Sequence, residues 1–168
     1  MTSRSTTADA YHPWTTYILA REEARRRGDR RAGTEHLALG LLGDPAIESL
    51  LGVRLQGARD ALDSLDRRAL GAVGIDATFD APSLPMRQTP TRPTVKAVLK
   101  DRLPLTPAAK AALQEAARPM RRGQQITPQQ VLLRLLDQKE PDPVATLFAT
   151  LGVDTAAVRE RLTQAPTP

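Results

Sequence analysis

The feature that most constrains this chain is an internal repeat. Residues 36–42 (HLALGLL) match residues 130–136 (QVLLRLL) at an offset of 94 residues. A second match aligns residues 51–53 with residues 151–153, at an offset of 100 residues. The six-residue difference falls in the turn after the apolar segment, where an insertion is tolerated. A repeat of this length predicts two copies of one structural unit.

Both copies have the pattern of short helices. Apolar residues recur at spacings of three and four, and no segment alternates as a strand does. Residues suited to begin a helix occur at Thr34, Asp44, Thr106, Thr127 and Asp142. Glycines suited to end one occur at Gly28, Gly52, Gly123 and Gly152. The sequence predicts an all-α fold of eight helices, at residues 12–27, 35–42, 45–51, 55–69, 107–122, 128–137, 143–151 and 155–164.

The repeat and the prolines divide the chain into units. We expect two four-helix units, related by a pseudo-twofold duplication and packed side by side. Prolines 82, 85, 90 and 93 argue against a continuous helix or a central strand between them, although residues 93–102 have a short helical pattern. The expected segments are a disordered tail at 1–10, a first unit at 11–70, a Pro-rich linker at 71–103, a second unit at 104–164 and a tail at 165–168.

The composition argues against most catalytic chemistry. The chain has no cysteine, which excludes a disulfide framework and a thiolate metal site. Its two histidines have no accompanying acidic cluster for zinc, and no GxxxxGK[ST] segment is present to hold a nucleotide phosphate. We therefore expect no catalytic residue, no cofactor and no metal. The lack of a signal-like N-terminus or a long apolar stretch favours a cytoplasmic protein without a membrane partner.

The charge leaves a second class of function open. The chain has 24 Lys and Arg residues against 19 Asp and Glu residues, and its pI is about 10.2. Such a balance allows a small basic nucleic-acid-binding or regulatory protein on the same helical scaffold. Acidic residues interleaved with the arginines of residues 21–31 weaken that alternative, as does the lack of an aromatic stacking pattern. The arginine-rich stretch is interpreted as a solvated helix face.

The two histidines are assigned structural roles. His12, beside Pro13, is interpreted as a helix cap. Glu35 and His36 could form an acid–base pair, but neighbouring residues on a helix point about 100° apart, and no nucleophile accompanies them. His36 is therefore expected to take part in the packing of the repeat.

The segments AREEARRRGDRRAGTEHLALGLL and LLGVRLQGARDAL resemble the first repeat of the Clp amino-terminal domain, the substrate- and adaptor-binding module of ClpA- and ClpC-type unfoldases. The segments LPLTPAAKAALQEA, QQITPQQVLLRLL and LGVDTAAVRERL resemble its second repeat. The resemblance covers residues 10–163. The long link LDRRALGAVGID is similar to that of stand-alone relatives without an ATPase module. The resemblance implies a Clp N-domain-like fold.

The resemblance also implies a phosphoarginine-like site. Family members hold the guanidinium group with the glutamate of the GTEH motif in each repeat. The first copy has Thr34 and Glu35, whereas the second has Pro128 and Gln129. A neutral amide does not fully replace a carboxylate opposite a guanidinium group. The expected site residues are Thr34, Glu35 and Gln129, with weaker binding in the second copy.

A groove for cyclic peptides is implied as well. In the family this groove lies between the first helices of the two repeats and includes an aromatic residue, whose position here is Leu105. Tyr11, Trp14 and Tyr17 cluster at the start of the first copy. Trp and Tyr are favoured at binding hot spots, although Trp14, Tyr17 and Ile18 also have the spacing of a core face. The expected groove residues are Tyr11, Trp14, Tyr17 and Leu105.

These observations lead to a functional hypothesis. The chain is expected to be a non-enzymatic module that modulates Clp proteolysis in trans or sequesters cyclic-peptide Clp inhibitors. The partners that the resemblance implies are unfolded or tagged peptide segments, a Clp adaptor or unfoldase, and a cyclic peptide natural product.

Overall fold

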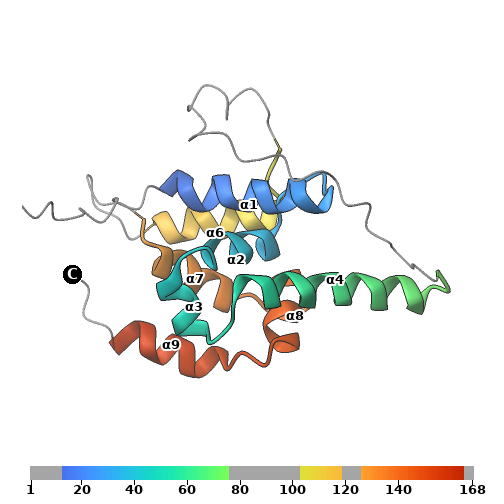
Figure 1. Cartoon of the computed structure of the whole chain (residues 1–168). Coiled ribbons are helices and arrows are strands. Elements are labelled where there is room, and N and C mark those ends of the chain that lie inside the picture. The colour runs from blue at the N-terminus through green and yellow to red at the C-terminus, as the bar shows by residue number, and fades with distance from the viewer. Residues whose placement is uncertain (1–12, 76–102, 119–125, 165–168) are drawn as a thin grey trace, which may run out of the picture.

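The computed structural model describes residues 13–75, 103–118 and 126–164 (Figure 1). Several expectations lie outside the described residues. These are the tails at 1–10 and 165–168, the cap at His12, the helix end at Gly123, the short helix at 93–102 and most of the linker.

The described residues fold into helices, as predicted. The first unit contains α1 (Pro13–Arg27), α2 (Thr34–Leu41), α3 (Pro45–Leu51) and α4 (Leu55–Ala72), and the second contains α6 (Pro107–Ala117), α7 (Pro128–Leu136), α8 (Pro143–Thr150) and α9 (Thr155–Gln164). An isolated parallel bridge pairs Ala32 with Leu105. The helix α4 ends at Ala72, beyond the expected residue 69. None of the described helices has the length and apolar character that crossing a membrane requires.

Four predicted helix starts are confirmed by hydrogen bonds. The side chains of Asp44, Thr106, Thr127 and Asp142 each accept from a backbone N–H in the first turn of α3, α6, α7 and α8, respectively. A proline follows each of these residues, where its missing N–H costs no helical hydrogen bond. The helix α3 ends at Gly52, whose φ of 68° lies in the left-handed region that glycine adopts easily.

The two units share one hydrophobic core. The helix α2 is buried nearly all round, and it contacts α1 and α4 of its own unit and α6, α7 and α8 of the other. The fourth helix of each unit contacts the third helix of the other, because α4 packs on α8 and α9 packs on α3 (Figure 1). The units are therefore more closely interlocked than a side-by-side arrangement implies.

The counterpart of α2 in the second unit, α7, is less enclosed than α2. In α7, Val131, Leu132, Leu135 and Leu136 are buried, but Leu133 is only partly buried, as is Arg134. The position that Arg134 occupies corresponds to Gly40 in α2. The second unit thus encloses its central helix less completely than the first unit does.

Gly40 allows α1 and α2 to approach closely. A Cβ at this position would lie 2.9 Å from the backbone N of Ala20 and 3.2 Å from the backbone O of Thr16. These neighbours are main-chain atoms of α1, so they cannot rotate away as a side chain can. The close α1–α2 contact requires glycine here.

Gly40→Ala is expected to lower the free energy of unfolding by about 1–2 kcal/mol, because overpacking outweighs the gain in helix propensity. Gly57→Ala is the matched control, since Gly57 lies in α4 and a Cβ there would meet nothing within 4 Å. It should raise the stability by about 0.5–1 kcal/mol. Urea unfolding of both variants tests the contact, and a stabilising Gly40→Ala would contradict it.

Candidate functional site

An ionic network connects α1 with α4. Glu23 of α1 accepts hydrogen bonds from Arg59 of α4 through both carboxylate oxygens, and Nε of Arg59 lies 3.0 Å from Oε2. Nε of Arg26 donates to the same Oε2 at 3.2 Å. Burial alone would raise the pKa of Glu23, but the guanidinium groups of Arg59 and Arg26 together hold that pKa below its ordinary value. Glu23 is therefore ionised at neutral pH.

Arg27 occupies the other part of this network. Its Nη1 donates to Oδ1 of Asp63 at 2.5 Å, its Nη2 donates to Asp66, and its Nε donates to Oδ2 of Asp29 at 3.3 Å. Burial would lower the pKa of Arg27, but the three carboxylates raise it above its ordinary value. Asp63 and Asp66 are three residues apart, so they share one face of α4.

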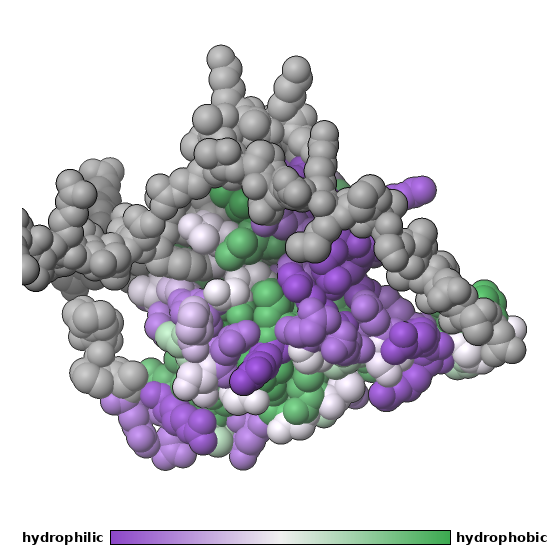
Figure 2. All heavy atoms as spheres, viewed as in Figure 1, coloured by the Kyte–Doolittle hydropathy of each residue, from purple (hydrophilic) through white to green (hydrophobic). Residues whose placement is uncertain are grey.

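The interpretation of the arginine-rich stretch as a solvated face is therefore wrong on one side of α1. Arg21 and Glu23 are only 3% and 8% exposed, and the guanidinium carbon of Arg21 lies 5.2 Å from the centroid of the Tyr17 ring. The sequence does not reveal that α4 supplies carboxylates to this side of α1. Figure 2 shows the hydrophilic residues gathered over the region where α1 ends beside α4.

The start of α2 is capped by a histidine side chain. The N-cap residue is Gly33, and its backbone N–H donates to Nδ1 of His36 at 3.0 Å. In the second unit, the backbone N–H of Thr127 donates to Oε1 of Gln130, also at 3.0 Å. His36 and Gln130 are the residues that the repeat aligns. His36 is 1% exposed, which confirms its structural role.

The carboxylate of Glu35 lies against this cap. Its Oε1 is 2.9 Å from Nδ1 of His36, and a Cβ on Gly33 would lie 2.4 Å from both carboxylate oxygens. Burial alone would raise the pKa of Glu35, but its contacts with the His36 imidazole, its own backbone N–H and the Thr34 hydroxyl together hold that pKa below its ordinary value. On the other side of the imidazole, Nε2 lies 2.9 Å from Oδ2 of Asp29 without the alignment of a hydrogen bond.

Thr34 joins the two units. Its hydroxyl donates to Oδ1 of Asp142 at 2.5 Å, and the same oxygen accepts from the backbone N–H of Val144 at the start of α8. The hydroxyl also lies 3.4 Å from Oε2 of Glu35. The expectation that Thr34 caps α2 is wrong, because Gly33 is the N-cap and Thr34 is the first helical residue.

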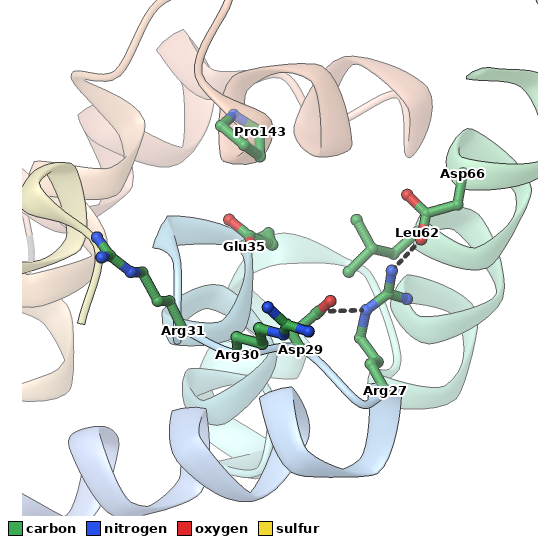
Figure 3. Close-up of a pocket in the computed structure, with 8 residues that line it drawn as sticks. All are labelled: Arg27, Asp29, Arg30, Arg31, Glu35, Leu62, Asp66 and Pro143. Carbon is green, nitrogen blue, oxygen red and sulfur yellow. Dashed lines mark hydrogen bonds and ion pairs between the residues drawn. The ribbon is translucent and has the colours of Figure 1, made fainter. Parts of the chain in front are cut away.

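A pocket opens between this region and the second unit. Its volume is about 390 Å³, at the lower end of the range of ligand pockets, and it suits one or two residues of a peptide. Figure 3 shows the carboxylate of Glu35 directed into the space below Pro143, with Arg31 on one side and the Arg27–Asp66 pair on the other. The lining residues are Arg27, Asp29, Arg30, Arg31, Glu35, Leu62, Asp66 and Pro143.

The three residues of the expected phosphoarginine-like site lie in different surroundings. Glu35 lines the pocket, whereas Thr34 is buried and its hydroxyl is bonded to Asp142. Gln129 is exposed near the start of α7 and is not among the residues that line this pocket. The pocket therefore brings together Glu35 and the preceding loop, rather than the two GTEH-like segments.

The expected groove residues are only partly described. Tyr11 lies outside the described residues, and Trp14 lies in α1 with its side chain not described. The Tyr17 hydroxyl donates to the backbone O of Leu103 at 3.5 Å, so Tyr17 lies near the segment that contains Leu105. Leu105 is half-buried, packs against the core and pairs with Ala32 through the bridge.

The sequence reasoning did not identify most of the pocket. The charge pattern places Asp29, Arg30 and Arg31 in a solvated run, and no sequence feature marks Leu62, Asp66 or Pro143 as site residues. The spacing of Asp63 and Asp66 indicates a common helix face, but no sequence signal shows that this face points toward Arg27. No group of three or more metal-ligating side chains occurs within the described ranges.

The described helices define a duplicated, all-α helical domain whose two units share a core. The solved structures include a similar one, the N-terminal domain of the caseinolytic-protease-associated chaperone ClpD from Arabidopsis thaliana, with a TM-score of 0.59 and 20% sequence identity. The match covers 89% of this chain and 88% of that one. No family model and no curated protein matches the sequence. The chain therefore has a Clp N-domain-like fold, as the resemblance predicts.

Replacing His36 tests the cap of α2. His36→Gln should keep most of the stability, because Gln130 already performs this function in the second unit. His36→Ala should lower the free energy of unfolding by at least about 1–3 kcal/mol, since it leaves the buried N–H of Gly33 without an acceptor. Thermal unfolding of both variants measures the difference. Equal losses in the two variants would exclude a capping role.

Acid should destabilise the protein through Glu23 and Glu35. The pKa values of both carboxyls are lower in the folded state than in the unfolded state. Their ionised forms therefore stabilise the fold at pH values above the unfolded pKa, about 4.3 for Glu, and this stabilisation is lost as the pH falls through the folded pKa values. The free energy of unfolding, measured with urea between pH 7 and pH 3, should fall less for Glu35→Gln than for the wild type. Glu115→Gln, on the exposed side of α6, is the control and should decline as the wild type does. Identical slopes in all three proteins would contradict the assignment.

Proposed function

We propose that this chain is a non-enzymatic binding module that captures charged peptide segments and thereby acts on Clp proteolysis. The observation that carries this proposal is the open pocket into which the ionised carboxylate of Glu35 points. The Clp N-domain-like fold supports the same class of function.

The chemistry of the pocket favours a guanidinium ligand. An ionised carboxylate binds a guanidinium group through charge-assisted, often paired hydrogen bonds. Glu35 is held in place by the cap of α2, so little side-chain entropy is lost when the ligand binds. The aligned residue of the second unit, Gln129, is uncharged. The proposal therefore assigns the principal arginine or phosphoarginine site to the first unit.

Two modes of action are proposed. As an adaptor-like module, the chain would bind unfolded or tagged segments and deliver them to, or withhold them from, a Clp unfoldase. As a sequestering protein, it would bind a cyclic peptide inhibitor in the groove assigned to Tyr11, Trp14, Tyr17 and Leu105. Addition of the chain to a Clp degradation assay, with and without such an inhibitor, separates these modes.

The proposal predicts that binding depends on Glu35. An unfolded polypeptide with phosphorylated arginines should bind the wild-type chain with a Kd of tens of micromolar, about −6 kcal/mol. Glu35→Gln should weaken this binding at least tenfold, because the ligand's guanidinium group loses its ionic partner. Titration calorimetry measures both affinities. The control Glu115→Gln makes the same charge change on α6 and should bind as the wild type does.

Two results would contradict the proposed function. The first is an absence of binding to phosphorylated and unphosphorylated polypeptides at this concentration, with a folded protein confirmed by circular dichroism. The second is binding to random duplex DNA that weakens steeply with salt while peptides do not bind, which would favour the nucleic-acid alternative.

A further inference from the structure

His36 is a buried ionisable group that lies against the candidate pocket. Its imidazole is 1% exposed. Nδ1 lies 2.9 Å from Oε1 of Glu35, and Nε2 lies 2.9 Å from Oδ2 of Asp29. Both carboxylates belong to residues that line the pocket (Figure 3). The imidazole therefore connects two of the pocket's acidic groups from inside the protein.

Nδ1 of His36 serves one partner at a time. In a neutral imidazole, one nitrogen carries the proton and the other accepts a hydrogen bond. The backbone N–H of Gly33 donates to Nδ1 at 3.0 Å, which assigns the single proton to Nε2, the nitrogen beside Asp29. In this form the imidazole offers no proton to Glu35 and does not compete for its carboxylate.

A second proton on the imidazole reverses this arrangement. It occupies Nδ1, which then donates to Oε1 of Glu35 and no longer accepts from Gly33. The carboxylates of Glu35 and Asp29, each at 2.9 Å, offset the cost of burying the charged ring. The charged form also explains how His36 contributes to lowering the pKa of Glu35.

The charges farther from the imidazole are paired elsewhere or exposed. Arg27 of α1 is bound to Asp29 and to Asp63 and Asp66 of α4, and Asp142 of α8 accepts from the hydroxyl of Thr34. The other charged groups of the loop before α2, of α6 and of α7 are Arg30, Arg31, Lys110, Glu115 and Arg134. Within the described residues, the only ion-pair partners of His36 are Glu35 and Asp29.

A guanidinium group on Glu35 and a second proton on His36 oppose one another. The charged imidazole occupies Oε1, so a ligand loses one of the two hydrogen bonds that a carboxylate offers to a guanidinium group. The two positive charges also repel at this short range. Histidine is the side chain whose ordinary titration falls between pH 5 and pH 8, so this opposition acts near neutral pH.

We propose that His36 is a proton switch for the pocket, which holds a guanidinium group while the imidazole is neutral and releases it when the imidazole takes up a proton. This inference rests on the proposed function and specifies how the same site is regulated. It concerns the guanidinium group, which arginine and phosphoarginine share. Affinity is therefore higher at neutral pH and falls on acidification.

The first test measures binding at two pH values. N-acetylargininamide carries a guanidinium group and no group that titrates near neutral pH. Titration of the full chain followed by NMR should give a Kd that is about fivefold or more higher at pH 5.5 than at pH 7.5. In His36→Gln this ratio should fall below about twofold, because glutamine accepts from the backbone N–H, as Gln130 does, but takes up no proton. The matched control His12→Gln replaces the other histidine of the sequence and should keep the wild-type ratio.

The second test uses the wild-type chain alone. Coupling between two binding events is reciprocal, so the ligand must disfavour the proton by the factor by which the proton disfavours the ligand. Saturating N-acetylargininamide should move the midpoint of the His36 NMR titration to lower pH, by about 0.7 pH unit for a fivefold coupling. The spectrum of His36→Gln identifies the His36 signal.

Four results would overturn the inference. They are equal affinity at the two pH values, an unchanged ratio in His36→Gln, a His36 midpoint that does not move with the ligand, and no binding of N-acetylargininamide at pH 7.5. Each leaves the proposed function intact if the phosphorylated polypeptide still binds at pH 7.5 in a Glu35-dependent manner. Loss of that binding would instead refute the proposed function itself.

Discussion

The whole structure depends on the burial of one short helix. An isolated helix of eight residues is not stable in water, and α2 is apolar nearly all round, so it needs cover from every side. The first unit supplies α1 and α4, and the second supplies α6, α7 and α8. Neither unit covers α2 alone, which explains why the repeat forms one core. The glycine at position 40 allows the closest of these approaches, that of α1.

The candidate site follows from the way this helix is held at its N-terminus. The side chain of His36 fixes the cap, and the hydroxyl of Thr34 reaches Asp142 at the start of α8. Between these two residues, Glu35 points outward into the pocket. The loop before α2 is held at Ala32 by its bridge to Leu105. The backbone that carries the Glu35 carboxylate is therefore held by contacts on both sides. Arg30 and Arg31 lie in the exposed part of the loop that precedes α2.

Features set by local sequence could be predicted, whereas those set by distant contacts could not. The repeat, the all-helical fold and four of the helix starts follow from spacing and capping residues. The sequence assigns the start of α2 to Thr34 because threonine has a capping side chain, whereas the N-cap is the preceding Gly33 and the N3 residue His36 accepts its backbone N–H. The burial of Glu23 and Arg27 depends on the position of α4, which no local pattern encodes. Glu35 was identified through a motif, but the arginines beside it were not.

The two units cap their central helices, α2 and α7, with different residues. In the second unit, Thr127 caps α7 with its own hydroxyl, and Gln130 completes the reciprocal pair. In the first unit the N-cap is glycine, which has no side chain to accept from the N–H groups of the first turn, and the space that a Cβ would occupy is taken by the carboxylate of Glu35. Replacing a capping side chain with alanine costs about 1 kcal/mol of stability, whereas replacing it with glycine costs only a few tenths of a kcal/mol. The first unit therefore gives up little stability to place an ionised group at its pocket.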